Sequence, residues 1–339
     1  MMKRILCLLL ALVLSLTVFA ACGNDKPDDG EKLTTLNIAY HTNPGGAAVV
    51  CIGTEQGIFE KYGFKCNLVG FTSGPVEIAA MLSGELDYGF IGHGAHTLAI
   101  DGKVDVLCYE KMGDDEAIIT SSDTGIKTLA DLKGKKIGTT LGTSGETVLM
   151  AALEAAGLTA KDVSIVNMDM GACVVAMVSG QIDAVCVYSQ YKNSVIDGLG
   201  SKAVTLAKTS SFDSLVAPSS WIATPEYINR NYEQSVRFCA AVLECIDYYS
   251  GHKDEAAKYM ADFLKLDYDQ VRTNIEAVVA LSLEDYEKAL NDGTLERIYQ
   301  AQQDNFLKSG KVSKSAEVDG YVRFDVMKDA IALVKEMNK

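Results

Sequence analysis

Short apolar segments alternate with longer amphipathic segments from residue 36 onward. Buried strands are predicted at residues 36–40, 65–71 and 86–92, where the chain reads LNIAY, KCNLVGF and LDYGFIG. Helices are predicted between them, over residues 46–63 and 75–82. The second helix begins at Pro75, a position where the missing backbone N–H carries no cost. Strands that alternate with helices are typical of βαβ units, so the pattern predicts an α/β fold.

One helix–glycine–strand pattern occurs twice. The segment AAMLSGELDYGF begins at Ala79 and VAMVSGQIDAVC begins at Val175, and five of their twelve positions are identical at an offset of 96 residues. Chance similarity is the alternative, because glycine commonly ends a helix. We interpret the repeat as two lobes of related α/β topology.

The alternation of strands and helices continues through the middle of the chain and then gives way to a mostly helical pattern. Helices are predicted from about Ser144, Ala172 and Ser189, and each precedes a strand (VSIVNM, DAVCVY and KAVTLA). From Asn231 onward the sequence is mostly helical. We therefore expect a second lobe inserted into a first lobe that also carries the C-terminal helices. The expected bounds are 35–119 and 217–339 for the first lobe and 120–216 for the second. The crossings near 118–121 and 216–223 would form a hinge.

The N-terminus has the pattern of an export signal. Lys3 and Arg4 precede an apolar stretch from residue 5 to 19, and small residues then lead to Cys22. The small residues before a cysteine resemble a bacterial lipobox, which implies a signal peptide over residues 1–21 and lipidation at Cys22. An uncleaved membrane anchor is the alternative, at the short end of spanning lengths. Residues 22–34 would then form a polar tether to the folded domain.

Charge and cysteine content narrow the function. The formal net charge of −14 repels phosphate backbones and excludes a nucleic-acid partner. Seven cysteines follow Cys22, without any C-x-x-C pair that would indicate zinc or redox chemistry. Most of them lie in apolar runs, so we expect buried small hydrophobic residues, with disulfides as the alternative for a secreted chain.

Residues 139–147 read TTLGTSGET and precede a predicted helix. The G-x-S-x-G motif of a nucleophile elbow requires glycine where the chain has Glu146. A P-loop requires lysine after the second glycine, and none follows Gly145. What remains is a hydroxyl-rich loop at a helix N-terminus, where free N–H groups attract an anion or a polar head group.

Several of these motifs together resemble a known family. They are LNIAYHTNPGG, GTEQGIFEKYGFKCNLV, EIAAMLSGELDYGF, TLADLKGKKIG and GTSGET, spread over about residues 35 to 230. In combination with the lipobox, the chain resembles substrate-binding lipoproteins of ABC importers, in the nitrate, sulfonate, taurine and thiamine-precursor binding group. The resemblance implies a type II periplasmic-binding-protein clamp: two α/β lobes with the solute between them. It also implies an extracytoplasmic, lipid-anchored, monomeric receptor without a cofactor, which delivers solute to permease subunits served by a separate ATPase.

The resemblance places the ligand at loops that follow the strands, as is general for open α/β sheets. In the first lobe the expected wall is His41, Thr42, Asn43, Thr72, Ser73, Gly74, Gly92, His93 and Gly94. In the second lobe it is Gly142, Thr143, Ser144, Gly145, Thr147, Asp169 and Tyr188. Glu116 is expected near the crevice, and Trp221 is expected to offer the ligand a flat apolar surface.

The chemistry of the ligand stays open at this stage. His41, His93 and His96 fall near the predicted crevice, so a metal-binding receptor is one alternative, with carboxylates from residues 114–116. Arginine is absent between Arg4 and Arg230, which disfavours carboxylate and phosphate-ester ligands. Helix N-termini could still hold a sulfonate or nitrate, whereas the acidic residues favour an amine or an aminopyrimidine.

An exported enzyme is the competing class. The chain lacks H-E-x-x-H, G-x-S-x-G, G-x-G-x-x-G and Walker A motifs, so a metalloprotease, a hydrolase, a dinucleotide enzyme and an ATPase are all disfavoured. Pyrimidine synthases that share the fold are a further alternative, but their cysteine-rich signature is missing. We expect a binding protein and not an enzyme.

Overall fold

The computed structural model describes residues 33–213, 215–276 and 278–339. Residues from Thr34 to Lys339 form one compact unit. Among the described residues, no helix is long and apolar enough to cross a membrane. The expected signal peptide, the lipidation site at Cys22 and nearly all of the tether lie outside the described residues.

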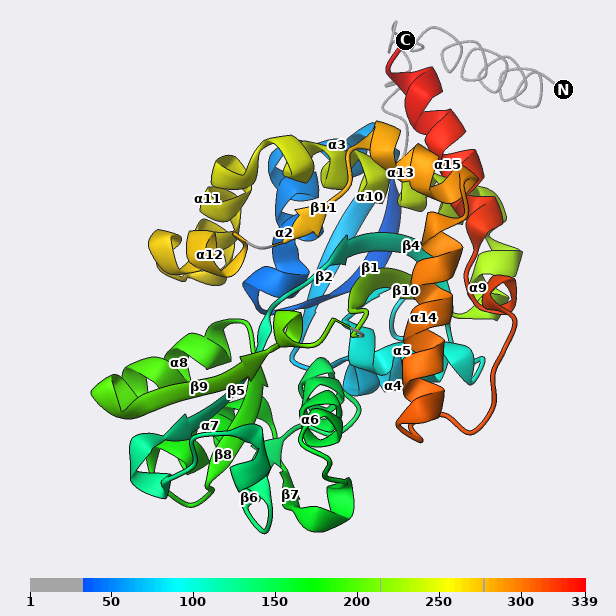
Figure 1. Cartoon of the computed structure of the whole chain (residues 1–339). Helices are drawn as coiled ribbons and strands as arrows, with labels where there is room; N and C mark the ends of the chain where they lie inside the picture. The colour runs from blue at the N-terminus through cyan, green and yellow to red at the C-terminus, as the bar shows by residue number, and fades with distance from the viewer. Residues whose placement is uncertain (1–32, 214, 277) are drawn as a thin grey trace, which may run out of the picture. The chain divides into compact units, whose positions relative to one another are not determined.

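The described strands pair into sheets of two, four and five strands (Figure 1), and the first two together form the sheet layer of the first lobe. The strands of the first lobe are β1 (Thr34–His41), β2 (Phe64–Phe71), β3 (Gly89–Ile91), β4 (Asp105–Met112), β10 (Pro218–Ala223) and β11 (Val279–Ala280). β1 and β2 pair in parallel along their full length, and a single bridge between Ile38 and Tyr88 continues this pair into β3. β10 then lies antiparallel between β3 and β4, with β11 at the edge of β4. The α/β class is confirmed, although the returning strand β10 makes the sheet mixed.

Helices cover the first sheet. They are α2 (Pro44–Glu55), α3 (Ile58–Lys61), α4 (Gly74–Leu82), α5 (His96–Ile100), α9 (Pro225–Arg230), α10 (Tyr232–Gly251), α11 (Lys253–Leu264), α12 (Tyr268–Asn274), α13 (Leu283–Asn291), α14 (Thr294–Lys308) and α15 (Phe324–Met337). The single helix predicted over residues 46–63 is wrong. Gly57 adopts φ 64°, a left-handed conformation that α-helices do not contain, and it separates α2 from α3.

The second lobe holds a five-stranded sheet in the order β7–β6–β8–β5–β9. Its strands are β5 (Glu116–Ser121), β6 (Lys136–Thr139), β7 (Ser164–Asn167), β8 (Ala184–Tyr188) and β9 (Ala203–Lys208), and its helices are α6 (Ser144–Ala155), α7 (Met170–Val178) and α8 (Gln190–Leu199). β5 runs antiparallel to both of its neighbours. The boundary expected between residues 119 and 120 falls inside β5, because the chain already enters this sheet at Glu116.

Both faces of the second sheet are buried, which explains the unbroken apolar run AVCVY of β8. Successive side chains of a strand point to opposite faces. Val185 and Val187 therefore pack with α7 and α8, whereas Ala184 and Cys186 pack with α6. Figure 1 shows these helices around the sheet. All seven cysteines of the described residues are free thiols, and all of them except Cys66 are buried.

Short 3₁₀ segments connect several of these elements. They are η1 (His93–Ala95), η2 (Ser122–Thr124), η3 (Leu129–Leu132), η4 (Ala160–Asp162), η5 (Gly200–Lys202), η6 (Thr209–Ser211) and η7 (Val318–Gly320).

The two copies of the repeated segment make the same contacts. Asp87 accepts a hydrogen bond from the Asn37 N–H at 2.7 Å, and Asp183 accepts one from the Lys136 N–H at 2.7 Å. Each carboxylate thus ties the strand of its own segment to a neighbouring parallel strand, which is β1 in the first lobe and β6 in the second. Gly84 and Gly180, which follow the repeated helices, both have positive φ. The similarity predicted from sequence is therefore a structural repeat.

Candidate functional site

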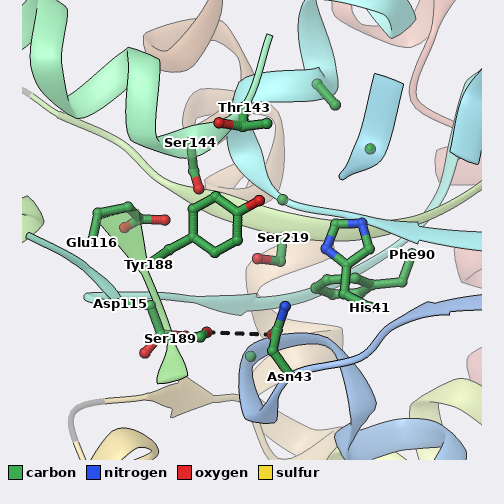
Figure 2. A pocket seen from close by; sticks show the side chains of 14 residues that line it. His41, Asn43, Phe90, Asp115, Glu116, Thr143, Ser144, Tyr188, Ser189 and Ser219 are labelled. Carbon is green, nitrogen blue, oxygen red and sulfur yellow. Dashed lines mark hydrogen bonds between the residues drawn. The ribbon is translucent and has the colours of Figure 1, made fainter. Parts of the chain in front are cut away.

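A pocket lies where the loops of the two sheets meet (Figure 2). Its cavity volume of about 50 Å³ is small. It is lined by His41, Asn43, Gly45, Gly74, Phe90, Gly92, Ala95, Asp115, Glu116, Thr143, Ser144, Tyr188, Ser189 and Ser219. Many of these residues follow β1, β3, β6 or β8, where open α/β sheets bind their ligands.

Four helices begin at or beside the pocket with uncapped N-termini. The N-cap residues of α2, α4, α6 and α8 are Asn43, Ser73, Thr143 and Ser189, and none of them accepts a side-chain capping hydrogen bond. By contrast, Asp169 caps α7 from its side chain. Uncapped first-turn N–H groups, together with the helix dipole, favour a negatively charged or strongly accepting group.

Two neighbouring carboxylates face the same pocket. Asp115 is half-buried overall. Its Oδ1 atom, however, is fully buried and has no hydrogen-bond partner. Burial, and then the charge of Glu116, raises the pKa of Asp115 to about 6. Glu116 accepts a hydrogen bond from the Thr209 hydroxyl and lies 3.8 Å from His93 Nδ1. Among the described residues, no lysine or arginine lines the pocket.

His41 reaches the pocket from the end of β1 and is backed by a buried acid. Its Nε2 lies 3.2 Å from a carboxylate oxygen of Glu77, a fully buried residue of α4. Burial raises the pKa of Glu77, and the imidazole opposes part of that shift. The ring of Phe90 meets the imidazole edge-on at a centroid distance of 5.2 Å.

Ser189 joins the two lobes at the pocket. It adopts φ 49°, which is rare for a residue other than glycine, and its hydroxyl lies within hydrogen-bond distance of Asn43 Oδ1 and Asp115 Oδ2 (Figure 2). Tyr188 donates its hydroxyl to the Thr72 carbonyl at 2.8 Å. First-lobe and second-lobe loops are therefore in direct contact around the pocket. Strained backbone held by such contacts is typical of binding sites.

The two lobes approach each other closely at Gly94. A Cβ atom at this position would lie 2.1 Å from the carbonyl carbon of Thr143, so no side chain fits there. Thr143 donates its hydroxyl to the Thr140 carbonyl, and Glu146 accepts from the Gly142 N–H. The TTLGTSGET loop is thus shaped by its own hydrogen bonds.

The three histidines proposed for a metal do not converge. His96 contacts Ser220 Oγ at 2.8 Å and the His93 carbonyl at 3.2 Å, inside the first lobe. Burial lowers the pKa of both His93 and His96 to about 3, so both are neutral near pH 7. In the part of the chain that the structure describes, no three His, Cys, Asp or Glu residues form a group that could hold a metal ion.

Trp221 does not lie where the sequence predicted it. Its indole is fully buried and donates to Glu110 Oε2 at 2.6 Å. The register of β10 against β4 shifts between Ser219 and Ser220, so Ser219 lines the pocket while Trp221 packs in the core. Phe90, which contacts the indole edge-on, supplies the aromatic surface instead.

The structure brings about half of the predicted residues to the pocket. Those that line it are His41, Asn43, Gly74, Gly92, Glu116, Thr143, Ser144 and Tyr188. Those that do not line it are Thr42, Thr72, Ser73, His93, Gly94, Gly142, Gly145, Thr147, Asp169 and Trp221. Thr72, Ser73 and Asp169 line a separate surface hollow instead. The lining residues outside the expected walls are Gly45, Phe90, Ala95, Asp115, Ser189 and Ser219. Of these, only Asp115 was named near the crevice, as one of the carboxylates of residues 114–116. Ser189 directly follows a predicted strand, a signal that could have revealed it.

Comparison with known proteins identifies the family. The family described as NMT1/THI5 like matches residues 46–256, more than half of the chain. A "Putative binding protein" of Brucella abortus (strain 2308) is 29% identical over 324 residues, covering 96% of this chain and 98% of that protein. A "Putative aliphatic sulfonates-binding protein" of Bacillus subtilis (strain 168) is 27% identical over 295 residues, covering 83% and 86%.

A solved structure has the same fold. The alkanesulfonate-binding protein SsuA from Xanthomonas axonopodis pv. citri, bound to MOPS, superposes with a TM-score of 0.68 at 20% identity. The match covers 85% of this chain and 97% of that one. The fold is therefore that of a periplasmic binding protein, and the chain belongs to the NMT1/THI5-like family.

Proposed function

We propose that the chain is the extracytoplasmic solute receptor of an ABC importer. The pocket between two α/β lobes carries this proposal, because a solute there touches both lobes at once. Such a solute makes its full set of contacts only when the lobes are closed, so binding shifts the population toward the closed form. The family resemblance supports a binding protein and not an enzyme.

We further propose that the solute carries a protonated nitrogen, as in an amine, an amidine or an aminopyrimidine. Asp115 and Glu116 place two adjacent carboxylates at a small pocket, and the Asp115 Oδ1 atom has no donor. Buried carboxylates that repel each other are costly unless a cation or N–H donor compensates them. A protonated nitrogen provides both charge and donors.

A second candidate is an anionic solute such as a sulfonate. Four uncapped helix N-termini and His41 favour it, and the Bacillus subtilis relative is named for aliphatic sulfonates. An aminosulfonate would satisfy both halves of the pocket at once, with its sulfonate at the helix N-termini and its nitrogen at Asp115.

Titration calorimetry on matched compounds separates the two candidates. Taurine and ethanesulfonate differ by one amine, and 4-aminopyrimidine and pyrimidine differ in the same way. We expect the nitrogen-bearing member of a pair to bind at least about tenfold more tightly, a difference of roughly 1.4 kcal/mol. Ethanesulfonate binding as tightly as taurine would favour the anionic candidate, and binding of neither class would contradict the receptor proposal.

The remaining features of the receptor are also proposals. We infer that residues from Glu116 to the link before β10 form the second lobe, and that the rest of the compact unit forms the first, with the two crossings as the hinge. Lipidation at Cys22 would anchor a monomer outside the cytoplasm, beside its permease and ATPase. Labelling with radioactive palmitate tests the anchor: the label should disappear in Cys22→Ala, and a labelled Cys22→Ala chain would refute it.

A further inference from the structure

Glu77, in the first turn of α4, is a fully buried carboxylate behind the pocket residue His41. His41 Nε2 lies 3.2 Å from Glu77 Oε2, and neither Glu77 oxygen accepts a well-aligned hydrogen bond in the described part of the chain. Glu77 does not itself line the pocket. A buried carboxylate lowers stability unless a cation or a donor compensates it. A buried acid beside a pocket histidine is therefore a candidate for a functional role.

The surrounding backbone leaves room for this pair and fixes its position. A Cβ atom at Gly89 would collide with the carboxylate of Glu77, and a Cβ atom at Gly46 would collide with the Cβ atom of His41. The ring of Phe90 meets the imidazole edge-on, at a centroid distance of 5.2 Å and an interplanar angle of 86°. Close packing on these sides restricts rotation of the imidazole, so the same ring nitrogen stays beside Glu77.

His41 presents its other ring nitrogen, Nδ1, to the pocket. In the part of the chain that the structure describes, Nδ1 makes no hydrogen bond and is not buried, and the imidazole lines the pocket (Figure 2). The number of protons on the pair decides what Nδ1 can do. With two protons, one lies between Nε2 and Glu77 and the other is on Nδ1, which donates. With one proton, Nδ1 carries a lone pair and accepts.

The charges around the pair favour the form with two protons, because that form is neutral and the form with one proton is an anion. The other titratable groups near the pair are Asp115, Glu116 and Tyr188 of the pocket, His93 of η1, which packs against α4, and Lys111 with its partner Glu110 beside the Phe90 ring. Two of the pocket groups are acids, and Lys111 is already neutralised by an ion pair of 2.5 Å. Burial also raises the pKa of Glu77, which favours retention of the second proton.

We propose that Glu77 is a positioning residue that acts through His41: it keeps a proton on Nδ1, so that His41 donates a hydrogen bond to an acceptor atom of the solute. This inference rests on the proposed receptor function. Asp115 and Glu116 bind the protonated nitrogen of the solute, and His41 binds an acceptor elsewhere in the same molecule. The solute class is thereby narrowed to small molecules that carry both groups, such as an aminosulfonate or an aminopyrimidine. An amine without an acceptor leaves the His41 donor unpaired.

Nuclear magnetic resonance of the solute-free protein tests the state of His41 without any ligand. Long-range ¹H–¹⁵N spectra of the chain labelled with ¹⁵N-histidine, recorded at pH 7.5, distinguish protonated from unprotonated ring nitrogens, and His41→Gln assigns the signals. We expect a protonated Nδ1 in the unmodified chain and in Glu77→Gln, whose amide can donate to Nε2. In Glu77→Met we expect an intermediate Nδ1 signal, because a neutral imidazole without a partner exchanges between its two tautomers. An unprotonated Nδ1 in the unmodified chain, or an unchanged signal in Glu77→Met, would overturn the proposal.

Calorimetry with matched compounds tests the consequence for specificity. Taurine and propylamine both carry an amine, but only taurine has acceptor oxygens; 4-aminopyrimidine and aniline differ likewise in their ring nitrogens. Glu77→Met should raise Kd about tenfold for the acceptor-bearing compound that binds and change Kd for its counterpart by less than about twofold. Glu77→Gln should stay within about threefold for both compounds. Glu85→Met, which removes an exposed carboxylate just after α4, is the control and should change neither Kd.

A stability measurement separates this role from a purely structural one. Glu77→Met replaces a buried carboxylate with an apolar side chain of similar size, so its free energy of unfolding should equal or exceed that of the unmodified chain. Equal losses of affinity for both members of a compound pair, or a loss in Glu77→Gln as large as in Glu77→Met, would refute the assigned role. An unmodified chain that binds none of the compounds would instead refute the receptor function, whereas the resonance experiment would still decide the state of His41.

Discussion

The substitution Asp115→Asn tests two roles of this carboxylate. It tests whether Asp115 binds the solute, and whether the ionised side chain lowers the stability of the solute-free protein. The pKa of Asp115 is raised from 3.8 to about 6, mainly by burial. A carboxyl whose folded-state pKa is raised contributes stability below its ordinary pKa, and this contribution is lost as the pH rises through about 6. At pH 7.5 the ionised side chain therefore destabilises the solute-free protein. The shift corresponds to about 3 kcal/mol, and we expect about 2 kcal/mol because the residue is partly exposed.

Asp115→Asn should therefore raise the free energy of unfolding of the solute-free protein by about 2 kcal/mol at pH 7.5. Urea denaturation measures this gain, which should vanish below pH 4, where the native carboxyl is also neutral. The same substitution should weaken binding of an amine-bearing solute by roughly 2 kcal/mol or more, about 30-fold in Kd, because the solute loses its counter-charge. Stability and affinity thus move in opposite directions.

The pH dependence of binding gives a further check on the same residue. If the solute needs the ionised carboxylate, Kd should be nearly constant between pH 7 and 8 and should rise about fivefold from pH 6 to pH 5. Asp114→Asn is the matched control, since it removes the same charge from a neighbour that does not line the pocket. Unchanged affinity in Asp115→Asn, or equal effects of the two substitutions, would refute the assigned role.

Three other substitutions distinguish roles within the site. Ser144→Ala should raise Kd about fivefold, the effect of one hydrogen bond near 1 kcal/mol; calorimetry that finds no change removes Ser144 from the site. Trp221→Phe should lower the free energy of unfolding by about 2 kcal/mol, because Glu110 loses a buried donor, while Kd stays within about twofold. A large loss of affinity would instead show that Trp221 contributes to solute binding. Gly94→Ala should raise Kd at least about tenfold without lowering the unfolding midpoint of the solute-free protein, because its Cβ collides with Thr143 only when the lobes are closed. Normal affinity in this variant would contradict closure.

The sequence predicted those features that depend on local periodicity. The α/β class, the repeat and the helix start at Pro75 follow from spacings of two and of about 3.6 residues. Strand ends were also predictable, and the residues at or just after them include His41, Asn43 and Tyr188, which line the pocket. Asp87 and Asp183 occupy equivalent positions of the repeat, and each accepts a hydrogen bond from a backbone N–H.

Features that depend on distant partners were not predictable. Trp221 is held in the core by Glu110, which lies on a neighbouring strand far away in sequence, and a register shift decides which residue of β10 reaches the pocket. Sequence periodicity does not specify strand direction, and so it did not reveal that β5 runs antiparallel to both of its neighbours. The sequence places the carboxylates of residues 114–116 near the crevice, but only the packing of Ser189 against Asp115 shows that this residue lines the pocket.

The central claim is that two lobes close around a solute, and single-molecule energy transfer tests it most directly. Dyes on Lys103→Cys in the first lobe and Lys161→Cys in the second report the separation of the lobes, in a soluble version that lacks residues 1–22. Both positions are exposed, whereas the seven described cysteines are buried or half-buried. We predict a broad or longer-distance population without solute, which shifts to one shorter distance when the tightest-binding compound is added. A distance distribution that is the same with and without a saturating, calorimetrically verified solute would contradict the account.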